Sequence, residues 1–274
     1  MSPPDAHIYP EATGLAINTV KAHQAPAPLK LYAGWFCPFV QRVWLVLEEK
    51  QIPYTYIEVN PYHKPASLLS LNPRGLVPTL EHDGKPLYES TVVVDFLNEA
   101  YPAAPGAGTA PLYPPDPYDK ARQRIWMDFV TSRIIPAYHR FLQYDGPEGE
   151  EGLAKVRAEY LGYLREWIGE ADAEGPWWGG KEPGAVDWNI APWVIRNWVF
   201  DEFKGGSGIP KEGEKGDDAV WKRWRKFAEA VADRRSVRET TSDAEHYRPL
   251  YKRYADNTAQ SELAKSIRAG RGVV

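Results

Sequence analysis

The chain has 274 residues, of which 43% are hydrophobic, and it carries a formal net charge of -4 at pH 7. This length suits one large domain or two ordinary ones, and the charge gives no reason to expect nucleic acid or an anionic membrane as a partner. A single cysteine excludes a disulfide framework and suits a reducing compartment. We expect a cytoplasmic protein, because no apolar run reaches the roughly 18 residues of a membrane span and the N-terminus lacks a basic start followed by an apolar core.

The first 28 residues contain several prolines and no periodic apolar pattern, which predicts an extended arm or a disordered segment. Residues 29–50 then read as an apolar strand, a break at Gly34 and an amphipathic helix opened by Cys37-Pro38. Proline is favoured in a first helical turn, where its missing N–H costs nothing. Behind it, apolar residues repeat at the spacing of one buried helix face: Val40, Val43, Trp44 and Leu47.

Cys37, the only cysteine, lies where the backbone N–H groups of this helix lack partners. Those donors and the positive helix end stabilise a thiolate, so we expect a thiol pKa below the ordinary value of ~8.5. Val40 stands where a Cys-x-x-Cys redox pair would have its second cysteine, and any thiol exchange therefore needs an external thiol. The alternative is a buried free cysteine that acts as a small hydrophobic residue.

The remainder of the first hundred residues alternates between strand and turn signals. Residues 54–59 predict a strand, and residues 60–71 a polar connection with room for a short helix. Asp83-Gly84 between two alternating runs predicts a hairpin, and Ser90 predicts the N-cap of a further helix. This order over residues 29–101 is a βαβ unit joined to a ββα unit, which forms a small mixed sheet with helices packed on it.

Residues 101–118 are rich in Pro, Ala and Gly and predict an interdomain linker. The sequence beyond them predicts helices, with an exposed loop over residues 205–216. The helical stretches are residues 121–142, 153–171, 186–203, 219–232 and 261–268.

Two further features suit a small zwitterionic peptide that bears a thiol. Pro78 follows Val77 in a tight turn that favours a cis bond, and the N–H and C=O of Val77 would then face outward as an edge for main-chain pairing. Ser90 and the free N–H groups of its helix form a carboxylate site, and Glu89 beside it could accept a bond from a ligand ammonium. Taken singly, a cap and a turn explain these residues equally well.

With these residues in view, the first part of the chain resembles the thioredoxin-like N-terminal domain of cytosolic glutathione transferases. The stretch from Gly34 to Arg42, Gly-Trp-Phe-Cys-Pro-Phe-Val-Gln-Arg, is similar to the omega class, whose members use cysteine where other classes use serine or tyrosine. The stretch Asn72-Pro-Arg-Gly-Leu-Val-Pro78 resembles the family's cis-proline loop, and Glu89-Ser90 its γ-glutamyl-binding pair. The resemblance spans about residues 29–255, because the helical remainder fits the family's C-terminal domain.

The resemblance implies an α/β thioredoxin-like N-terminal domain followed by an all-α helical domain. We divide the chain into an N-terminal extension (1–28), a glutathione-binding domain (29–101), a linker (102–118), a substrate-binding domain (119–255) and a tail (256–274). It also implies that glutathione is the co-substrate and that Lys64 pairs with its glycyl carboxylate. The implied groove is lined by Phe36, Cys37, Pro38, Lys64, Leu76, Val77, Pro78, Glu89 and Ser90. A homodimer is expected from the resemblance, and the six histidines show no metal-ligand spacing.

One position departs from the family. The core helix of the second domain usually opens with a Ser/Thr-x-x-Asp capping box, whereas Gly184 stands here three residues before Asp187. Because Asp187 can still bond back to backbone N–H groups and glycine is an acceptable if poorer cap, we expect the helix to be kept.

A stripe on the helix over residues 121–142 offers two interpretations. Arg122, Trp126, Phe129 and Arg133 recur at helical spacing and would form an aromatic wall with cations if they faced Cys37, with Trp35 and Phe39 on the same wall. Such a pocket would favour flat, polyphenol-like or carbonyl-bearing aromatic substrates. In the other interpretation, the arginines are solvated and Trp126 packs against a neighbouring helix.

These features predict an omega-type glutathione-dependent thiol transferase or reductase that works through a disulfide between Cys37 and glutathione. Reduction of dehydroascorbate is a side activity that the resemblance implies. The alternative function is a non-catalytic carrier that binds hydrophobic aromatic compounds.

Overall fold

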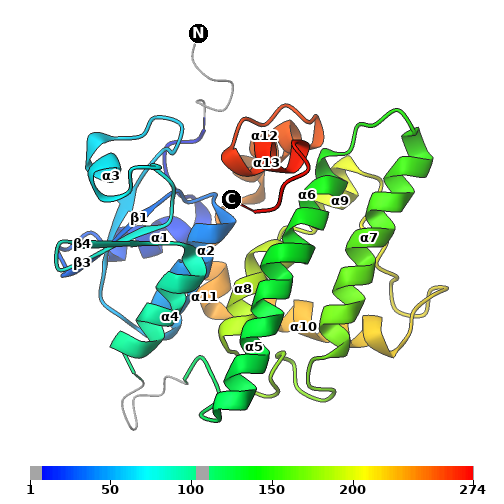
Figure 1. The fold of residues 1–274 in the computed structure, drawn as a ribbon, viewed down its shortest axis with the longest axis horizontal. Helices are drawn as coiled ribbons and strands as arrows, with labels where there is room; N and C mark the ends of the chain where they lie inside the picture. The colour runs from blue at the N-terminus through cyan, green and yellow to red at the C-terminus, as the bar shows by residue number, and fades with distance from the viewer. Residues whose placement is uncertain (1–7, 103–110, 274) are drawn as a thin grey trace. The chain divides into compact units, whose positions relative to one another are not determined.

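The computed structural model describes residues 8–102 and 111–273. The chain divides into two compact units (Figure 1), one formed by Met1–Leu112 with Asp233–Tyr247 and the other by Tyr113–Ala232 with Arg248–Val274. The second unit contains most of the predicted helical region. The segment Asp233–Tyr247 lies within that region of the sequence but belongs to the first unit.

The first unit contains a four-stranded sheet of order β2-β1-β3-β4, with only the β1–β2 pair parallel. Figure 1 shows α2 and α4 next to each other beside this sheet. The predicted βαβ and ββα units are confirmed. The elements are α1 (Gly14–Ala22), β1 (Leu29–Ala33), α2 (Pro38–Glu49), β2 (Thr55–Glu58), α3 (Ala66–Leu71), β3 (Thr79–His82), β4 (Lys85–Tyr88), α4 (Ser90–Ala100) and α11 (Arg235–Glu239).

Local signals position this sheet and its main helix. Asp83 and Gly84 both have positive φ, 49° and 76°, as the two central residues of a tight hairpin turn require. The predicted apolar face of α2 is at most 1% exposed at Val40, Val43, Trp44 and Leu47. The amino end of α2 is therefore fixed in place by a buried helix face.

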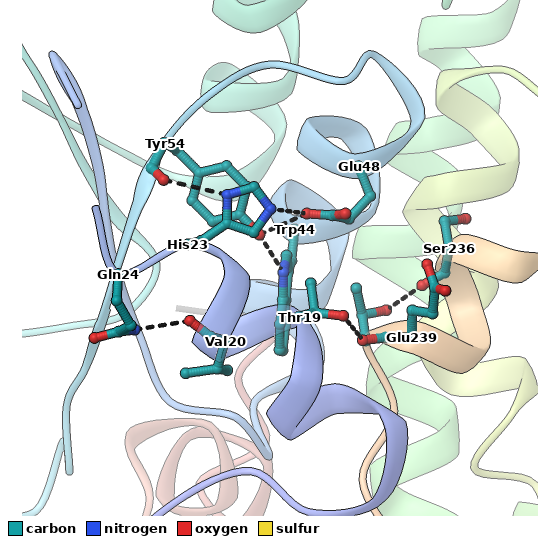
Figure 2. Close-up of polar contacts among 10 residues, drawn as sticks. Thr19, Val20, His23, Gln24, Trp44, Glu48, Tyr54, Ser236 and Glu239 are labelled. Atoms are coloured by element: carbon teal, nitrogen blue, oxygen red, sulfur yellow. Dashed lines mark hydrogen bonds and ion pairs between the residues drawn. The ribbon is translucent and has the colours of Figure 1, made fainter. Parts of the chain in front are cut away.

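The N-terminal segment differs from its prediction, because residues 14–22 form the helix α1 and not an extended arm. Figure 2 shows how the end of this helix is held: the His23 ring stacks on Tyr54, and its Nε2 lies 3.2 Å from Oε1 of Glu48. The Thr19 hydroxyl donates to the Glu239 carbonyl at 2.7 Å. These contacts come from distant parts of the chain, so the local sequence pattern carried no signal for the helix.

The segment Asp233–Tyr247 packs along α2 within the same unit, with contacts at both ends of the helix. Arg234 donates to both carboxylate oxygens of Glu49, at 2.9 and 2.6 Å. The amide of Gln41 donates to the Thr241 hydroxyl at 2.9 Å. A surface of α2 that a lone thioredoxin-like domain would leave to solvent is thereby covered.

In the part that the structure describes, every named element of the second unit is a helix, and two predicted helices are subdivided. The predicted helix over 121–142 begins at Pro117 and contains a π turn just before Pro136. Proline has no N–H to donate to the helix, and this interrupts the regular hydrogen-bond pattern. The predicted helix over 186–203 is interrupted at Ile195–Asn197. The elements are α5 (Pro117–Phe129), η1 (Val130–Ile134), α6 (Ile135–Gln143), α7 (Gly149–Gly169), α8 (Ala185–Val194), α9 (Trp198–Phe203), α10 (Ala219–Asp233), α12 (Ala244–Ala255) and α13 (Glu262–Arg268).

The start of α8 confirms the expected role of Asp187. Its Oδ2 accepts from the Gly184 N–H at 2.7 Å, and its Oδ1 accepts from the Trp178 N–H at 2.8 Å. Burial raises the pKa of this carboxyl to about 6, against the backbone donors that favour the carboxylate. One side chain thus caps the helix and also anchors the loop before it.

The α6 helix carries an unusual buried imidazole. His139 is 3% exposed, and neither ring nitrogen has a hydrogen-bond partner in the described ranges. Burial lowers its pKa to about 3, so the ring stays neutral in the folded protein where an unfolded chain would bind a proton.

We predict that His139→Leu flattens the acid dependence of stability. In wild type, the depressed pKa of His139 adds to the free energy of unfolding at pH values above the unfolded-state pKa of about 6.5. This contribution is lost as the pH falls toward the folded-state pKa of about 3, because only the unfolded chain then binds a proton at this residue. Between pH 8 and pH 5, wild type should lose about 2 kcal/mol more free energy of unfolding than the variant, as measured by urea titration. The exposed His63→Leu serves as the control. Equal losses in wild type and His139→Leu would contradict the assignment.

Candidate active site

Cys37 is the N-cap residue of α2, with Pro38 in the first helical turn as predicted. The Cys37 N–H donates to the Gly34 carbonyl at 2.9 Å, and the Cys37 carbonyl accepts from the Gln41 N–H at 3.1 Å. Its side chain is half-buried, and Sγ lies 3.8 Å from the carbonyl oxygen of Val77. Cys37 is therefore not fully buried, unlike the cysteine of the alternative interpretation.

The loop opposite the sulfur contains the predicted cis bond between Val77 and Pro78. Asn72 is buried and pins this loop: its amide donates to the Leu76 carbonyl at 3.3 Å, and its Oδ1 accepts from the Arg74 N–H at 3.1 Å. Among the described residues, no main-chain group forms a hydrogen bond with the N–H or C=O of Val77. Its backbone edge can therefore pair with an extended ligand.

Gly75 gives this loop its close approach to Lys64. Its φ is +61°, and a Cβ built there would lie 2.5 Å from the Lys64 side chain. Lys64 itself is exposed, and its Nζ donates to the Arg74 carbonyl at 2.7 Å. Because an ammonium has three donors, the remaining two can still meet a carboxylate.

The Glu89-Ser90 pair opens α4 in a way that differs in one respect from its prediction. Glu89 is the N-cap residue, with a positive φ of 69°, and Ser90 is the first helical residue. The side chain of Glu89 is exposed and lies 3.4 Å from Nη1 of Arg74. Ser90 is buried, and its hydroxyl accepts from Arg42 instead of capping the helix.

Arg42 is a member of this site that the sequence pattern did not single out. It is 1% exposed, its Nη1 donates to the Ser90 hydroxyl at 3.2 Å, and its Cζ lies 5.2 Å from the centroid of the Phe39 ring. Burial lowers the pKa of this guanidinium to about 9, whereas Cys37 raises it. Arg42 therefore remains charged at neutral pH and adds a second positive group that favours the Cys37 thiolate.

The aromatic residues around Cys37 differ in exposure. Trp35 is 1% exposed and donates from Nε1 to the Tyr9 carbonyl at 2.9 Å, so it offers almost no surface to an incoming molecule. Phe36 and Phe39 are half-buried. The expectation that Trp35 lines a substrate pocket stays a prediction, and this burial counts against it.

In the second unit, the aromatic stripe has partners on its own neighbours. Trp126 lies near the Trp178 ring, with centroids 6.3 Å apart, and Phe129 meets Tyr163 of α7 edge-on at 5.7 Å. Arg122 pairs with Glu170 at 2.8 Å, and Arg133 is exposed. These contacts are the ones that the packing interpretation of the stripe expects.

Two searches of the described residues bear on other site types. They contain no group of three or more His, Cys, Asp or Glu side chains that could hold a metal ion. None of the described helices is both long and apolar enough to cross a bilayer.

We predict that Arg42→Met raises the pKa of the Cys37 thiol by about one unit and slows its alkylation by iodoacetamide at pH 6.5 several-fold, because the thiolate fraction falls. Arg42→Lys keeps the charge and should recover part of the rate. The exposed Arg238→Met is the matched control. An unchanged rate in folded Arg42→Met would show that the guanidinium does not act on the sulfur.

The first unit is a thioredoxin-like domain, because it has a mixed sheet flanked by helices and a helix that starts at Cys37-Pro38 opposite a cis-proline. The second unit is helical. Residues 36–100 match the family model described as the N-terminal domain of glutathione S-transferase. Glutathione S-transferase omega-1 of Sus scrofa is 32% identical over 189 residues, which cover 67% of this chain and 75% of the relative.

Solved structures agree with this match. The crystal structure of glutathione transferase Omega 3C from Trametes versicolor has a TM-score of 0.78 at 41% identity, and the match covers 92% of this chain and 100% of that chain. Rice GST1, solved in complex with glutathione, has a TM-score of 0.69 at 26% identity, covering 83% of this chain and 96% of that chain. The chain therefore belongs to the omega-class glutathione transferases, a family of enzymes that use glutathione as co-substrate.

Proposed function

We propose that this protein is a glutathione-dependent thiol transferase or reductase that removes glutathione from small-molecule adducts and mixed disulfides. One observation carries the proposal: a partly open cysteine at the amino end of α2, with a buried guanidinium nearby and its sulfur 3.8 Å from the backbone edge of Val77. A serine or tyrosine here could only hydrogen-bond the sulfur of glutathione. A thiolate can instead attack that sulfur where it carries a leaving group, as in a mixed disulfide, and displace that group.

Glutathione would bind as an extended peptide along the Val77 edge, because its main chain can pair there. The Ser90 hydroxyl accepts from Arg42 and keeps its own proton to donate to the γ-glutamyl carboxylate, while Glu89 would meet the ammonium group. Lys64 would meet the glycyl carboxylate with its remaining donors. The other predicted contacts are Phe36, Pro38, Leu76 and Pro78.

The reaction would proceed by two exchanges at sulfur. The Cys37 thiolate attacks the glutathione sulfur of a mixed disulfide, a Cys37–glutathione disulfide forms, and the other thiol leaves with the electron pair. For a glutathionylated aromatic ketone, the pair goes to the carbon next to the carbonyl, which then takes a proton. A second glutathione thiolate then opens the Cys37 disulfide, because the described chain has no second cysteine to do so, and oxidised glutathione leaves.

The substrate would be a small hydrophobic or aromatic molecule. Phe39, two residues from Cys37 and half-buried, is the better-exposed candidate wall beside it, and Trp126, Phe129 and Arg133 of the second unit remain predictions. Reduction of dehydroascorbate would need the same thiolate and is proposed as a side activity. A cytoplasmic location fits a mechanism that consumes reduced glutathione.

We also propose a homodimer. Exposed apolar side chains favour association, since they recur on each unit: Tyr88 and Val92 on the first, Tyr118 and Ile125 on the second, the last two 70% and 64% exposed.

We predict that Cys37→Ser abolishes thiol transfer and gains some conjugation of glutathione to electrophiles, because a hydroxyl can hydrogen-bond the glutathione sulfur but cannot form a disulfide. The measurement is reduction of a mixed disulfide of glutathione and mercaptoethanol, run beside conjugation to an aryl halide. Cys37→Ala is the matched control and should lose both activities. An unchanged transfer rate in Cys37→Ser would refute the proposal, and tight binding of aromatic ligands without turnover in wild type would favour the carrier.

A further inference from the structure

A carboxylate on the neighbouring strand lies against the loop that carries Cys37. Glu58 is the last residue of β2 and pairs in register with Ala33 at the end of β1. Its Oε1 accepts from the Trp35 N–H at 3.1 Å, and its Oε2 accepts from the Tyr56 hydroxyl at 3.0 Å. The mechanism proposed above gives this residue no role.

The first of these hydrogen bonds reaches Cys37 through a single peptide group. The Trp35 N–H and the Gly34 C=O belong to the same peptide, and the Gly34 oxygen accepts from the Cys37 N–H at 2.9 Å. The carboxylate, this peptide and the Cys37 amide therefore form a chain of hydrogen bonds. Such bonds polarise one another, and one that ends on a charged acceptor is about twice as strong as a neutral one.

We propose that Glu58 is a positioning residue for Cys37. The ionised carboxylate of Glu58 acts through the Gly34–Trp35 peptide group and holds the loop in the geometry that presents the Cys37 sulfur to its reaction partner. The inference rests on the proposed function, in which Cys37 is the reacting group. It predicts that the thiolate reacts faster when Glu58 is ionised. Repulsion between the two negative charges would instead lower the fraction of Cys37 that is ionised, so the thiolate fraction and the rate per thiolate are measured separately.

The surroundings of Glu58 make its charge sensitive to pH near neutrality. Burial raises its pKa to about 7, and Glu11, in the segment before α1, raises it further. The Trp35 N–H and the Tyr56 hydroxyl favour the carboxylate and lower the pKa. Burial also raises the pKa of Tyr56 well above 10, with Glu58 and the neighbouring Tyr54 and Tyr247 adding to this, so Tyr56 remains a donor throughout the range.

The test is the rate at which iodoacetamide alkylates the full-length protein between pH 5 and 9, in wild type, Glu58→Gln and Tyr56→Phe. Alkylation reports on Cys37 alone, because the chain has one cysteine, and the thiolate fraction is measured separately from its ultraviolet absorbance. In wild type, the rate per thiolate should rise about fivefold as Glu58 ionises, the size expected for the gain of one charge-assisted hydrogen bond.

Glu58→Gln keeps an oxygen acceptor but not the charge. The rise of the rate per thiolate with pH, here called the step, should therefore disappear, and the rate should stay at the value that wild type has at low pH. Tyr56→Phe removes a donor that favours the carboxylate, so the step should move to higher pH. A purely structural role for Glu58 would lower the melting temperature without removing the step.

A step that persists in Glu58→Gln, or a wild-type rate per thiolate that falls as Glu58 ionises, would overturn the inference. If Glu58→Gln does not fold, Tyr56→Phe decides: an upward shift supports the inference and an unmoved step overturns it. Turnover of a glutathionyl mixed disulfide is measured in parallel. Its absence would overturn the proposed function while the alkylation profile still judges the role of Glu58.

Discussion

Stabilisation of a negative charge on Cys37 by the amino end of α2 is the interaction that the proposed chemistry requires. Cys37-Pro38 follows directly after a buried strand and a short break, so that Cys37 stands at the positive amino end of a helix whose other face is buried. The four-stranded sheet brings the cis-proline loop opposite that point. Without the charge, the surrounding groups would still bind a peptide, but the cysteine would lack the reactivity that distinguishes this class.

Two charged side chains modify this arrangement from different elements of the same unit. Arg42, on α2 itself, brings a buried positive charge that links the cysteine to Ser90, and so connects the reacting group with the expected γ-glutamyl site. Glu58, on β2, acts on the backbone before the cysteine. The guanidinium favours the ionised sulfur, whereas the carboxylate holds the loop at some cost in repulsion. The proposed chemistry therefore draws on buried charged groups that act on Cys37 without touching the substrate.

The sequence predicted those parts of the fold that local patterns determine. The sheet, the Asp83-Gly84 turn and the cap by Asp187 follow from alternation, turn chemistry and short-range hydrogen bonds, and all are confirmed. The prediction of an extended or disordered N-terminal segment was wrong where α1 forms. This helix is held by contacts with Tyr54, Glu48 and Glu239, which lie far along the chain. Arg42 was missed because a charged residue within a helix is normally solvated, and only its three-dimensional surroundings reveal a buried guanidinium.

The most direct test of the account is a titration of the Cys37 thiolate by its ultraviolet absorbance in the intact protein, with Cys37→Ser as the blank. One cysteine gives one transition. The account predicts a midpoint clearly below the value of ~8.5 for an ordinary thiol. A midpoint at or above that value would contradict it, because neither the helix end nor Arg42 would then be stabilising the charge on the sulfur.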